Sequence, residues 1–325
     1  MLINAEKIPN IPWEDRPKDS SAPVWRYSLN PVIGRNPTAK LARVFNSALV
    51  PYKKGFIGVF RAEDHTGIPH LYLGESSDGI HIKLNDEQIH FVDEQGKEAK
   101  SNYQYDPRLI KLEDSYYIVW CDDFFGPALA IARTDDFKTF VKLGHPFLPF
   151  NRNGVLFPRK INGEYVILSR PSDSGHTAFG DIFLSKSPDL IHWGECEHVM
   201  EKGWEWWDTI KIGGGCNPIE TDEGWLLFFH GVTGSCNGFI YSFSVALLDK
   251  DDPSKVKMRC MDYLLTPEMD YETRGFVPNV VFPTSALVDK ESGKIAIYYG
   301  AADTCTGLCF TTVDILMKYL KVHKR

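Results

Sequence analysis

The chain has 325 residues, of which 43% are hydrophobic and 24% charged, as in an ordinary globular protein with a substantial core. Its 36 Lys and Arg residues face 43 Asp and Glu residues, and the net charge is −7. This balance disfavours nucleic acid or an anionic membrane as a partner. Any cationic site must therefore be local.

Cysteine usage and hydropathy indicate a reducing compartment. The seven cysteines are odd in number and form no CxxC pair, so neither a disulfide framework nor a zinc site is indicated. The N-terminus has no apolar signal region, and no run approaches the roughly 20 apolar residues of a membrane helix. We expect a cytoplasmic protein.

Short β-type runs separated by Gly, Pro, Asn and Asp fill most of the chain, and helical periodicity is scarce before residues 313–322. Five segments repeat one order of short strand, aromatic-rich strand and third strand. Their three runs lie at residues 44–50, 55–61 and 70–78; 105–111, 116–122 and 128–135; 156–161, 164–170 and 181–189; 216–220, 225–230 and 239–248; and 282–288, 294–300 and 307–313.

Repeats of about 50 to 65 residues, each a small antiparallel sheet, are typical of a β-propeller. The pattern predicts an all-β fold, a five-bladed β-propeller with a short C-terminal helix. A β-sandwich and a pair of β-domains remain as alternatives, and neither requires a fivefold repeat. We expect one catalytic domain over residues 1–325, with an N-terminal segment of about 40 residues packed on the propeller or on a neighbouring subunit.

A cationic stretch at residues 151–181 stands out in this acidic chain. Arg159 and Lys160 fit surface positions beside strands equally well. Arg152 lies in an Asn/Gly-rich turn, and Arg170 ends an apolar run, where a sheet delivers its side chain to a rim. The arginine fork suits bidentate binding of phosphate or carboxylate. With His176, these residues indicate an anion site.

The repeat also aligns polar residues at strand ends. Second strands end at Arg61, Cys121 and Asp122, Arg170, His230 and Gly300, and first strands begin near Asn46, Asp106, Arg159, Asn217 and Thr284. Because inner strands of a propeller converge on a central channel, we expect these side chains to gather in one pocket.

Asp106, with Tyr105 beside it and Pro107 after it, is a candidate general acid, although an Asp before Pro is often a turn residue. An inverting hydrolase needs a second carboxylate to activate water. Phosphate needs no such base, but it needs cations to bind it. The candidates are Arg152, Arg170, Lys211 and His230, with neutral hydrogen bonds from Asn46, Ser47 and Tyr241. Lys211 also fits an exposed strand, and His230 also fits a core.

Three tryptophans, Trp204, Trp206 and Trp207, precede Lys211. Indole faces stack on the apolar faces of sugar rings, so the cluster is a candidate acceptor site. Core packing or a subunit contact would explain it equally well.

Motifs over nearly the whole chain resemble glycoside hydrolase family 130, the β-mannoside phosphorylases. They are Phe45-Asn-Ser47, Gly58-Val-Phe-Arg61, Tyr105-Asp-Pro-Arg108, the block from Pro149 to Gly163, Ser169-Arg-Pro-Ser-Asp173, Gly175-His176, Phe179-Gly-Asp-Ile182, His230-Gly231, Cys236-Asn-Gly238 and Tyr298-Tyr-Gly-Ala-Ala-Asp-Thr304. The block at residues 151–173 is specific to the phosphorylase branch, and the family has a five-bladed propeller.

The resemblance implies a role for each matched residue. Asp106 becomes the general acid, with its proton reaching the glycosidic oxygen through the 3-hydroxyl of the mannosyl unit. The implied phosphate positions are Arg152, Arg170, Lys211, His230 and Tyr241, with Asn46 and Ser47 nearby, and the implied mannose positions are Arg61, Tyr105 and Asp303. The chain departs from the family at residues 122–125 and 203–208, where acceptor recognition would lie.

The sequence therefore predicts an inverting phosphorylase that transfers the non-reducing β-1,4-mannosyl unit of manno-oligosaccharides to inorganic phosphate, giving α-mannose 1-phosphate. Phosphate is the co-substrate, no metal or organic cofactor is implied, and family members often form homo-oligomers. The alternatives are a mannosyl-N-acetylglucosamine phosphorylase, a β-mannosidase on the same fold and a non-catalytic sugar-binding propeller.

Overall fold

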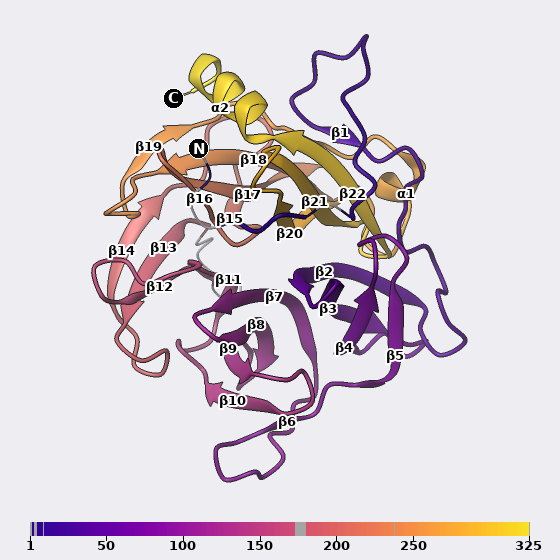
Figure 1. Cartoon of the computed structure of the whole chain (residues 1–325), viewed down its shortest axis with the longest axis vertical. Helices are drawn as coiled ribbons and strands as arrows, with labels where there is room; N and C mark the ends of the chain where they lie inside the picture. Colours follow the sequence, from indigo (N-terminus) through magenta and orange to yellow (C-terminus); the bar gives the residue numbers. More distant parts are fainter. Residues whose placement is uncertain (1, 3–4, 9, 173–179, 237, 325) are drawn as a thin grey trace.

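Five antiparallel sheets surround a central axis in the computed structural model of the chain, which describes residues 2, 5–8, 10–172, 180–236 and 238–324 (Figure 1). The predicted five-bladed propeller is confirmed. Two helices accompany the sheets in these residues, α1 (Asp270–Thr273) and α2 (Val313–Val322), and α2 lies on the outside of the propeller.

The blades follow one another in chain order. Blade 1 has β2 (Arg43–Tyr52), β3 (Gly55–Glu63), β4 (Pro69–Ser76) and β5 (Lys83–Gln88). Blade 2 has β7 (Gln104–Leu112), β8 (Ser115–Asp123), β9 (Pro127–Thr134) and β10 (Phe140–Gly144), with β6 (Phe91–Val92) at its edge. Blade 3 has β11 (Asn151–Leu156), β12 (Tyr165–Pro171), β13 (Ile182–Ser187) and β14 (Gly194–Met200).

Blade 4 has β15 (Lys211–Gly214) and β16 (Ile219–Thr221), which both pair with β17 (Gly224–Ser235), followed by β18 (Gly238–Leu248) and β19 (Val256–Arg259). Blade 5 has β20 (Val281–Val288), β21 (Lys294–Ala301), β22 (Cys305–Thr312) and the N-terminal β1 (Trp25–Arg26). The innermost strands β2, β7, β11, β15 and β20 come from all five blades and lie around the axis (Figure 1).

The N-terminal strand completes the last blade, because Trp25 pairs with Phe310 on the outer strand β22. Arg26 fixes this closure: its Nε donates to Oε1 of the buried Glu272 at 2.7 Å. Further upstream, the Ile8 amide donates to Asp289 Oδ1 at 2.8 Å. These contacts join parts of the N-terminal segment to blade 5 and to α1.

Both faces of the second strands of the blades are largely buried, which explains why the aromatic runs show no polar alternation. Along β21, Ile295 and Ile297 enter the cluster between blades 4 and 5, whereas Ala296 and Tyr298 enter the cluster between blades 5 and 1. Similar clusters join the other neighbouring blades. The core is therefore divided among five interfaces between blades.

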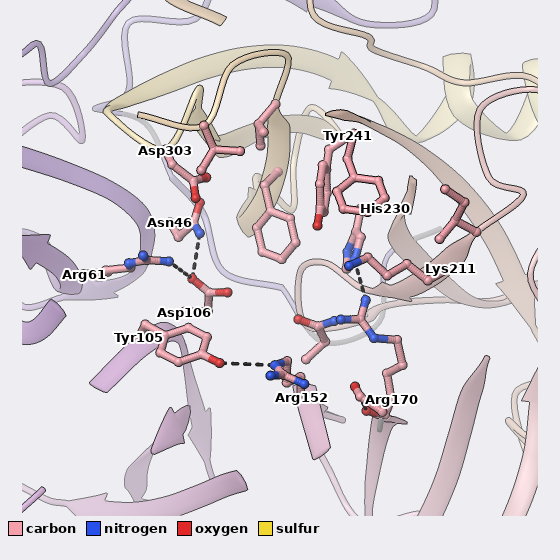
Figure 2. A pocket seen from close by; sticks show the side chains of 17 residues that line it. Asn46, Arg61, Tyr105, Asp106, Arg152, Arg170, Lys211, His230, Tyr241 and Asp303 are labelled. Atoms are coloured by element: carbon pink, nitrogen blue, oxygen red, sulfur yellow. Dashed lines mark hydrogen bonds and ion pairs between the residues drawn. The ribbon is translucent and has the colours of Figure 1, made fainter. Parts of the chain in front are cut away.

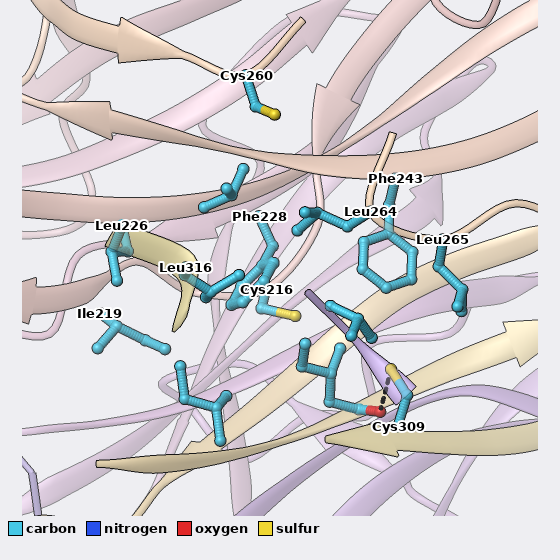
Figure 3. Close-up of a cluster of buried hydrophobic side chains, with 14 of the residues drawn as sticks. Cys216, Ile219, Leu226, Phe228, Phe243, Cys260, Leu264, Leu265, Cys309 and Leu316 are labelled. Carbon is cyan, nitrogen blue, oxygen red and sulfur yellow. Dashed lines mark hydrogen bonds between the residues drawn. The ribbon is translucent and has the colours of Figure 1, made fainter. Parts of the chain in front are cut away.

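The cluster between blades 4 and 5 also receives the C-terminal helix (Figure 3). Thr312 caps α2 by accepting a hydrogen bond from the Ile315 amide at 3.1 Å, and Leu316 and Leu320 are buried beneath it. Cys216 and Cys309 pack in the same cluster as small apolar groups. Within the described ranges, no helix has the length and apolar character needed to span a membrane.

Two first-strand predictions were wrong. The first strand of blade 4 was placed at residues 216–220, which overlaps only β16, whereas the inner strand β15 lies at Lys211–Gly214. The first strand of blade 3 was placed at residues 156–161, but β11 begins at Asn151 and ends at Leu156. The prediction started the strand at the apolar run, whereas the strand begins within the polar sequence Asn-Arg-Asn-Gly. Arg159 consequently does not align with Asp106: its Nη2 pairs with Glu220 Oε1 at 2.6 Å, away from the central site.

Candidate functional site

A cavity of about 600 Å³ opens at one end of the central channel (Figure 2). Every blade contributes to it. The residues that line it are Asn46, Arg61, Tyr105, Asp106, Arg152, Asn153, Arg170, Ser172, Ile210, Lys211, His230, Phe239, Tyr241, Val277, Val280, Phe282 and Asp303. The strand-end residues Asn46, Arg61, Asp106, Arg170 and His230 thus gather as predicted, whereas Cys121, Asp122, Arg159, Asn217, Thr284 and Gly300 do not line the cavity.

Bulges on the inner strands aim three of these side chains. The pairing register shifts between Phe45 and Ala48 in blade 1, and in the same way in blades 2 and 3. The residues inside the bulges are Asn46, Asp106 and Asn153, with φ of 49°, 53° and 58°. Asn and Asp tolerate this left-handed conformation better than most residues. The Asp before Pro is therefore both a local backbone feature and a cavity group.

One half of the cavity is acidic and internally paired; it comprises Asn46, Arg61, Asp106 and Asp303. Asp106 Oδ1 accepts hydrogen bonds from Asn46 Nδ2 at 2.7 Å and from Arg61 Nη1 at 3.0 Å (Figure 2). Arg61 also binds the buried Glu63 at 2.7 Å. These contacts fix the Asp106 carboxylate before any ligand enters.

Asp303 shares this acidic half. Burial raises its pKa to about 6, although the nearby Arg61 charge acts in the opposite direction. Its backbone φ of 46° follows another positive value at Ala302, at the turn between β21 and β22. Besides Asp106, the site thus contains the carboxyl of Asp303, whose protonation changes near pH 6.

The buried Arg108 supports the backbone of the Asp106 bulge. Arg108, which is 1% exposed, donates from Nη1 to the Asp106 carbonyl at 2.9 Å and from Nε to the Gly215 carbonyl. It therefore ties β7 to the inner strand of blade 4. Burial lowers its pKa. Arg108 positions Asp106 without lining the cavity.

The opposite half is cationic and comprises Arg152, Arg170, Lys211 and His230. Arg152 and Arg170 are direct partners across β11 and β12. Arg152 Nε donates to the Tyr105 hydroxyl at 3.2 Å. Asn153, with its amide oxygen turned toward Arg170, accepts hydrogen bonds from Nη1 at 2.8 Å and Nη2 at 3.2 Å.

The charges of this half repel one another. Burial, with Arg152 nearby, lowers the pKa of Arg170 to about 10. Burial and the two arginines lower the pKa of Lys211 to about 8, and burial with Arg170 lowers that of His230 well below its ordinary value. Arg170 Nη1 lies 3.0 Å from His230 Nε2, which must therefore be unprotonated, since a guanidinium only donates.

No carboxylate in the described ranges forms an ion pair with Arg152, Arg170 or Lys211. Buried cations without a counter-ion are costly, and an anion between them would supply one. This half therefore has the charge that binding of an anion requires. Tyr241, whose ring is stacked near His230, adds a hydroxyl group to the same wall.

Two predicted residues lie elsewhere than expected. Ser47 is fully buried, its Oγ lies 3.3 Å from Thr306 Oγ1, and it does not line the cavity, so its assignment to phosphate is wrong. The inner strand alternates, and Asn46 takes the cavity side. Asn46 itself lies in the acidic half with Asp106 rather than among the cations.

The three tryptophans separate. Trp207 is 1% exposed, packs on Phe229 and donates from Nε1 to the Met261 carbonyl at 2.7 Å, so it is a core residue and its acceptor assignment is wrong. Trp204 and Trp206 are exposed, at 78% and 56%, but neither lines the cavity. Their acceptor role stays a prediction.

Sequence reasoning missed Asn153, Arg108 and the aromatic wall of Phe239 and Phe282. An available signal was the repeat itself: Asn153 falls at the bulge position of Asn46 and Asp106, once β11 is placed correctly. Asp173, His176 and Phe179 lie outside the described residues. In the residues that are described, no cluster of His, Cys, Asp and Glu could hold a metal ion.

Comparison with known proteins relates this geometry to one family. The sequence model of glycoside hydrolase family 130, described as β-1,4-mannooligosaccharide phosphorylase, matches residues 4–322. The β-1,4-mannooligosaccharide phosphorylase of Ruminococcus albus is 52% identical over 99% of this chain and 98% of its own. The β-1,2-mannobiose phosphorylase of Listeria innocua is 33% identical over 80% of this chain and 71% of its own.

The fold is similar to that of a solved relative. The structure of β-1,2-mannobiose phosphorylase from Listeria innocua in complex with β-1,2-mannobiose superposes with a TM-score of 0.81 at 26% sequence identity. The match covers 92% of this chain and 99% of the other.

Proposed function

Because the chain belongs to glycoside hydrolase family 130, the β-mannoside phosphorylases, we propose that it cleaves the non-reducing terminal β-1,4-mannosyl unit of manno-oligosaccharides with inorganic phosphate. The products are α-mannose 1-phosphate and an oligosaccharide shortened by one unit. Inorganic phosphate is the co-substrate.

A single observation carries this proposal: the buried Arg170 and the half-buried Arg152 and Lys211, which form no ion pair with a carboxylate of the described residues, face a hydrogen-bonded carboxylate across the cavity (Figure 2). An inverting hydrolase would need a carboxylate on the cationic side to activate water. The described carboxylates that line the cavity are Asp106 and Asp303, and both lie in the acidic half. Phosphate is itself an anionic nucleophile, so cations are what its binding requires.

The cationic half binds and aims the nucleophile. Arg152, Arg170 and Lys211 supply donors for the phosphate oxygens, with Tyr241 and the neutral His230 beside them. Phosphate relieves the repulsion between these cations, so its binding is favoured by the charges that burial has left unpaired. One phosphate oxygen then attacks the anomeric carbon of the mannosyl unit.

The acidic half receives the sugar and supplies the proton. Arg61 and Asp303 border the terminal mannosyl unit, and Asp106 is the general acid. As the bond from phosphate oxygen to C1 forms, the glycosidic C1–O bond breaks. The leaving oxygen then receives the proton that originates on Asp106, through the 3-hydroxyl of the mannosyl unit. Attack opposite the leaving group inverts the anomeric configuration.

The β-1,4 linkage is favoured by the relatives. Identity is 52% with a β-1,4-mannooligosaccharide phosphorylase and 33% with a β-1,2-mannobiose phosphorylase, and the first match spans nearly the whole of both chains. The cytoplasmic location and the homo-oligomeric state stay predictions.

Incubation of the purified protein with β-1,4-mannobiose, with and without inorganic phosphate, tests the proposal. We expect mannose 1-phosphate and mannose in equal amounts, with no release when phosphate is omitted. The initial product should be the α-anomer by NMR. Release of two mannose molecules without phosphate would identify a hydrolase, and no turnover in either condition would leave a sugar-binding protein.

A further inference from the structure

A second, largely apolar groove of about 480 Å³ adjoins the cavity between blades 1 and 2. Its walls are Gly67, Ile68 and Pro69 from the turn between β3 and β4, and Asn102 and Tyr103 from the segment that leads into β7. Arg61 and Tyr105 line both the groove and the cavity. The groove and the cavity therefore share a wall.

Hydrogen bonds of the backbone and of side chains hold the two walls of the groove in shape. In the β3–β4 turn, Asp64 Oδ1 accepts from the Thr66 amide at 2.7 Å, and the Asp64 carbonyl accepts from the Gly67 amide at 3.2 Å. This turn presents Ile68, which is 48% exposed. On the other wall, Asn102 Nδ2 donates to Asp123 Oδ2 at 2.6 Å.

Two tyrosines continue the surface from the cavity into the groove. Tyr103 and Tyr105 are two residues apart on an extended segment and face the same side, with ring centroids 5.9 Å apart and ring planes at 37°. That separation is comparable with the step from one ring to the next in a β-1,4-linked chain. Tyr105 in turn lies under the Arg61 guanidinium, at 5.3 Å from its ring centroid.

The direction of attack determines on which side the acceptor lies. The cations belong to blades 3 and 4, whereas Asp106 and Arg61 belong to blades 2 and 1 (Figure 2). In an inverting displacement the leaving oxygen is opposite the nucleophile. With phosphate on the cations, the leaving acceptor therefore lies toward blades 1 and 2, where the groove opens.

We propose that this groove binds the second sugar ring of the acceptor, that is, the third unit of the oligosaccharide from its non-reducing end. The inference rests on the proposed function. The first acceptor ring lies beside Tyr105 inside the cavity, and the second ring places its apolar face on Tyr103 and Ile68. Asn102 lies in the same wall, where its side chain can form a hydrogen bond with a hydroxyl group of the sugar.

Chain-length kinetics of Tyr103→Ala and Ile68→Ser test the groove, because mannobiose has no ring to place in it. We expect kcat/KM for β-1,4-mannotriose and mannotetraose to fall about threefold to tenfold, in line with aromatic contacts of this kind. For mannobiose it should stay within about twofold of the parent. Tyr103→Phe should keep the parent's preference, because stacking needs no hydroxyl.

Ile191→Ser is the matched control for Ile68→Ser, because Ile191 is 45% exposed in the turn between β13 and β14 and does not line the groove or the cavity, and it should leave the ratio of trisaccharide to disaccharide unchanged. Thermal unfolding of each variant checks that the fold persists. Equal losses for mannobiose and mannotriose, or no loss for either, would overturn the assignment of the groove. A parent protein without phosphate-dependent turnover of any substrate would refute the proposed function, and the groove assignment with it.

Discussion

The acidic half and the cationic half of the cavity differ in whether their charged groups have partners of opposite charge. In the acidic half, Asp106 accepts from Asn46 and Arg61, and Arg61 is further bound to Glu63, so the polar groups satisfy one another. In the cationic half, Arg152 and Arg170 lie directly across from each other, and burial depresses the pKa of Arg170 and of Lys211.

This difference indicates which half is complete without a ligand. Paired groups keep a fixed geometry, as general acid catalysis requires. Cations that are buried or half-buried and form no ion pair with a described carboxylate repel one another, and an anion would remove this repulsion, so ligand binding and local stability are coupled in that half. Variants on the two sides should consequently fail in different ways.

The largest expected effect is on the acidic side. Asp106→Asn preserves size and can still accept from Asn46, but an amide cannot deliver a proton. We expect kcat to fall at the upper end of the roughly 10²- to 10⁴-fold range for general acid catalysis. Phosphorolysis and synthesis share a transition state and should fall together, which initial rates in both directions will measure.

Phosphate binding should survive this change, because the cationic half is intact. Calorimetric titration with phosphate is the control. A folded Asp106→Asn protein that retains more than about a tenth of parent activity, against that expected loss, would move the acid role to another group, with Asp303 the first candidate.

Next in size are the arginines of the cationic half. Arg152→Ala and Arg170→Ala should each weaken phosphate use by about 1.5 to 3 kcal/mol, the contribution of a hydrogen bond to a charged group, which is roughly a 10- to 150-fold rise in the apparent phosphate constant. The apparent constant for mannobiose should change less. The rise of Tm that phosphate gives the parent should shrink in both variants.

Arg133→Ala is the matched control, since it removes a half-exposed arginine from the outer part of blade 2. It should leave phosphate use unchanged. Parent-like phosphate constants in both cavity variants would remove the two arginines from the anion site.

A smaller effect should appear as a pH dependence of phosphate binding in the cationic half. With a pKa of about 8, Lys211 loses its charge as pH rises through 8, so phosphate affinity should weaken over pH 8 to 9.5. Without phosphate and between about pH 8 and 10.5, the Lys211 side chain is protonated in the unfolded chain and deprotonated in the native chain. In that window this group makes stability rise with pH.

Lys211→Arg keeps its charge throughout and should flatten the decline in affinity above pH 8. Phosphate constants measured from pH 6.5 to 9.5 for the parent and the variant provide the comparison. The same decline in both proteins would assign the pH dependence to another group.

The smallest effects should come from the exposed tryptophans. Trp204→Ala and Trp206→Ala remove side chains that do not line the cavity, so stability should change by less than about 0.5 kcal/mol. With the acceptor toward blades 1 and 2, acceptor preference among mannose, glucose and N-acetylglucosamine in synthesis should stay as in the parent, and the acceptor role predicted for both residues from the sequence would then be wrong. A shifted preference would place the acceptor on the cationic side and contradict the division of the two halves.

Several features were predictable from the sequence because they depend on local pattern. The fivefold repeat and the apolar runs determine a propeller, since strands buried on both faces need neighbours on both sides. Arg152 was singled out in an Asn/Gly-rich turn, and Arg170 and Asp106 were singled out at strand ends. All of them line the cavity.

Other features required the tertiary structure. Whether Asn46 or Ser47 faces the channel, and whether β11 begins at Asn151 or at Leu156, depends on bulges and register, and a slip of one residue reverses every side chain. The burial of Trp207 depends on the packing of blades 3 and 4. The sequence thus determined the blades and the kinds of charge they carry. Closure of the five blades decided which charges are paired and which face the cavity, because ion pairs depend on distances between strands that lie far apart in the chain.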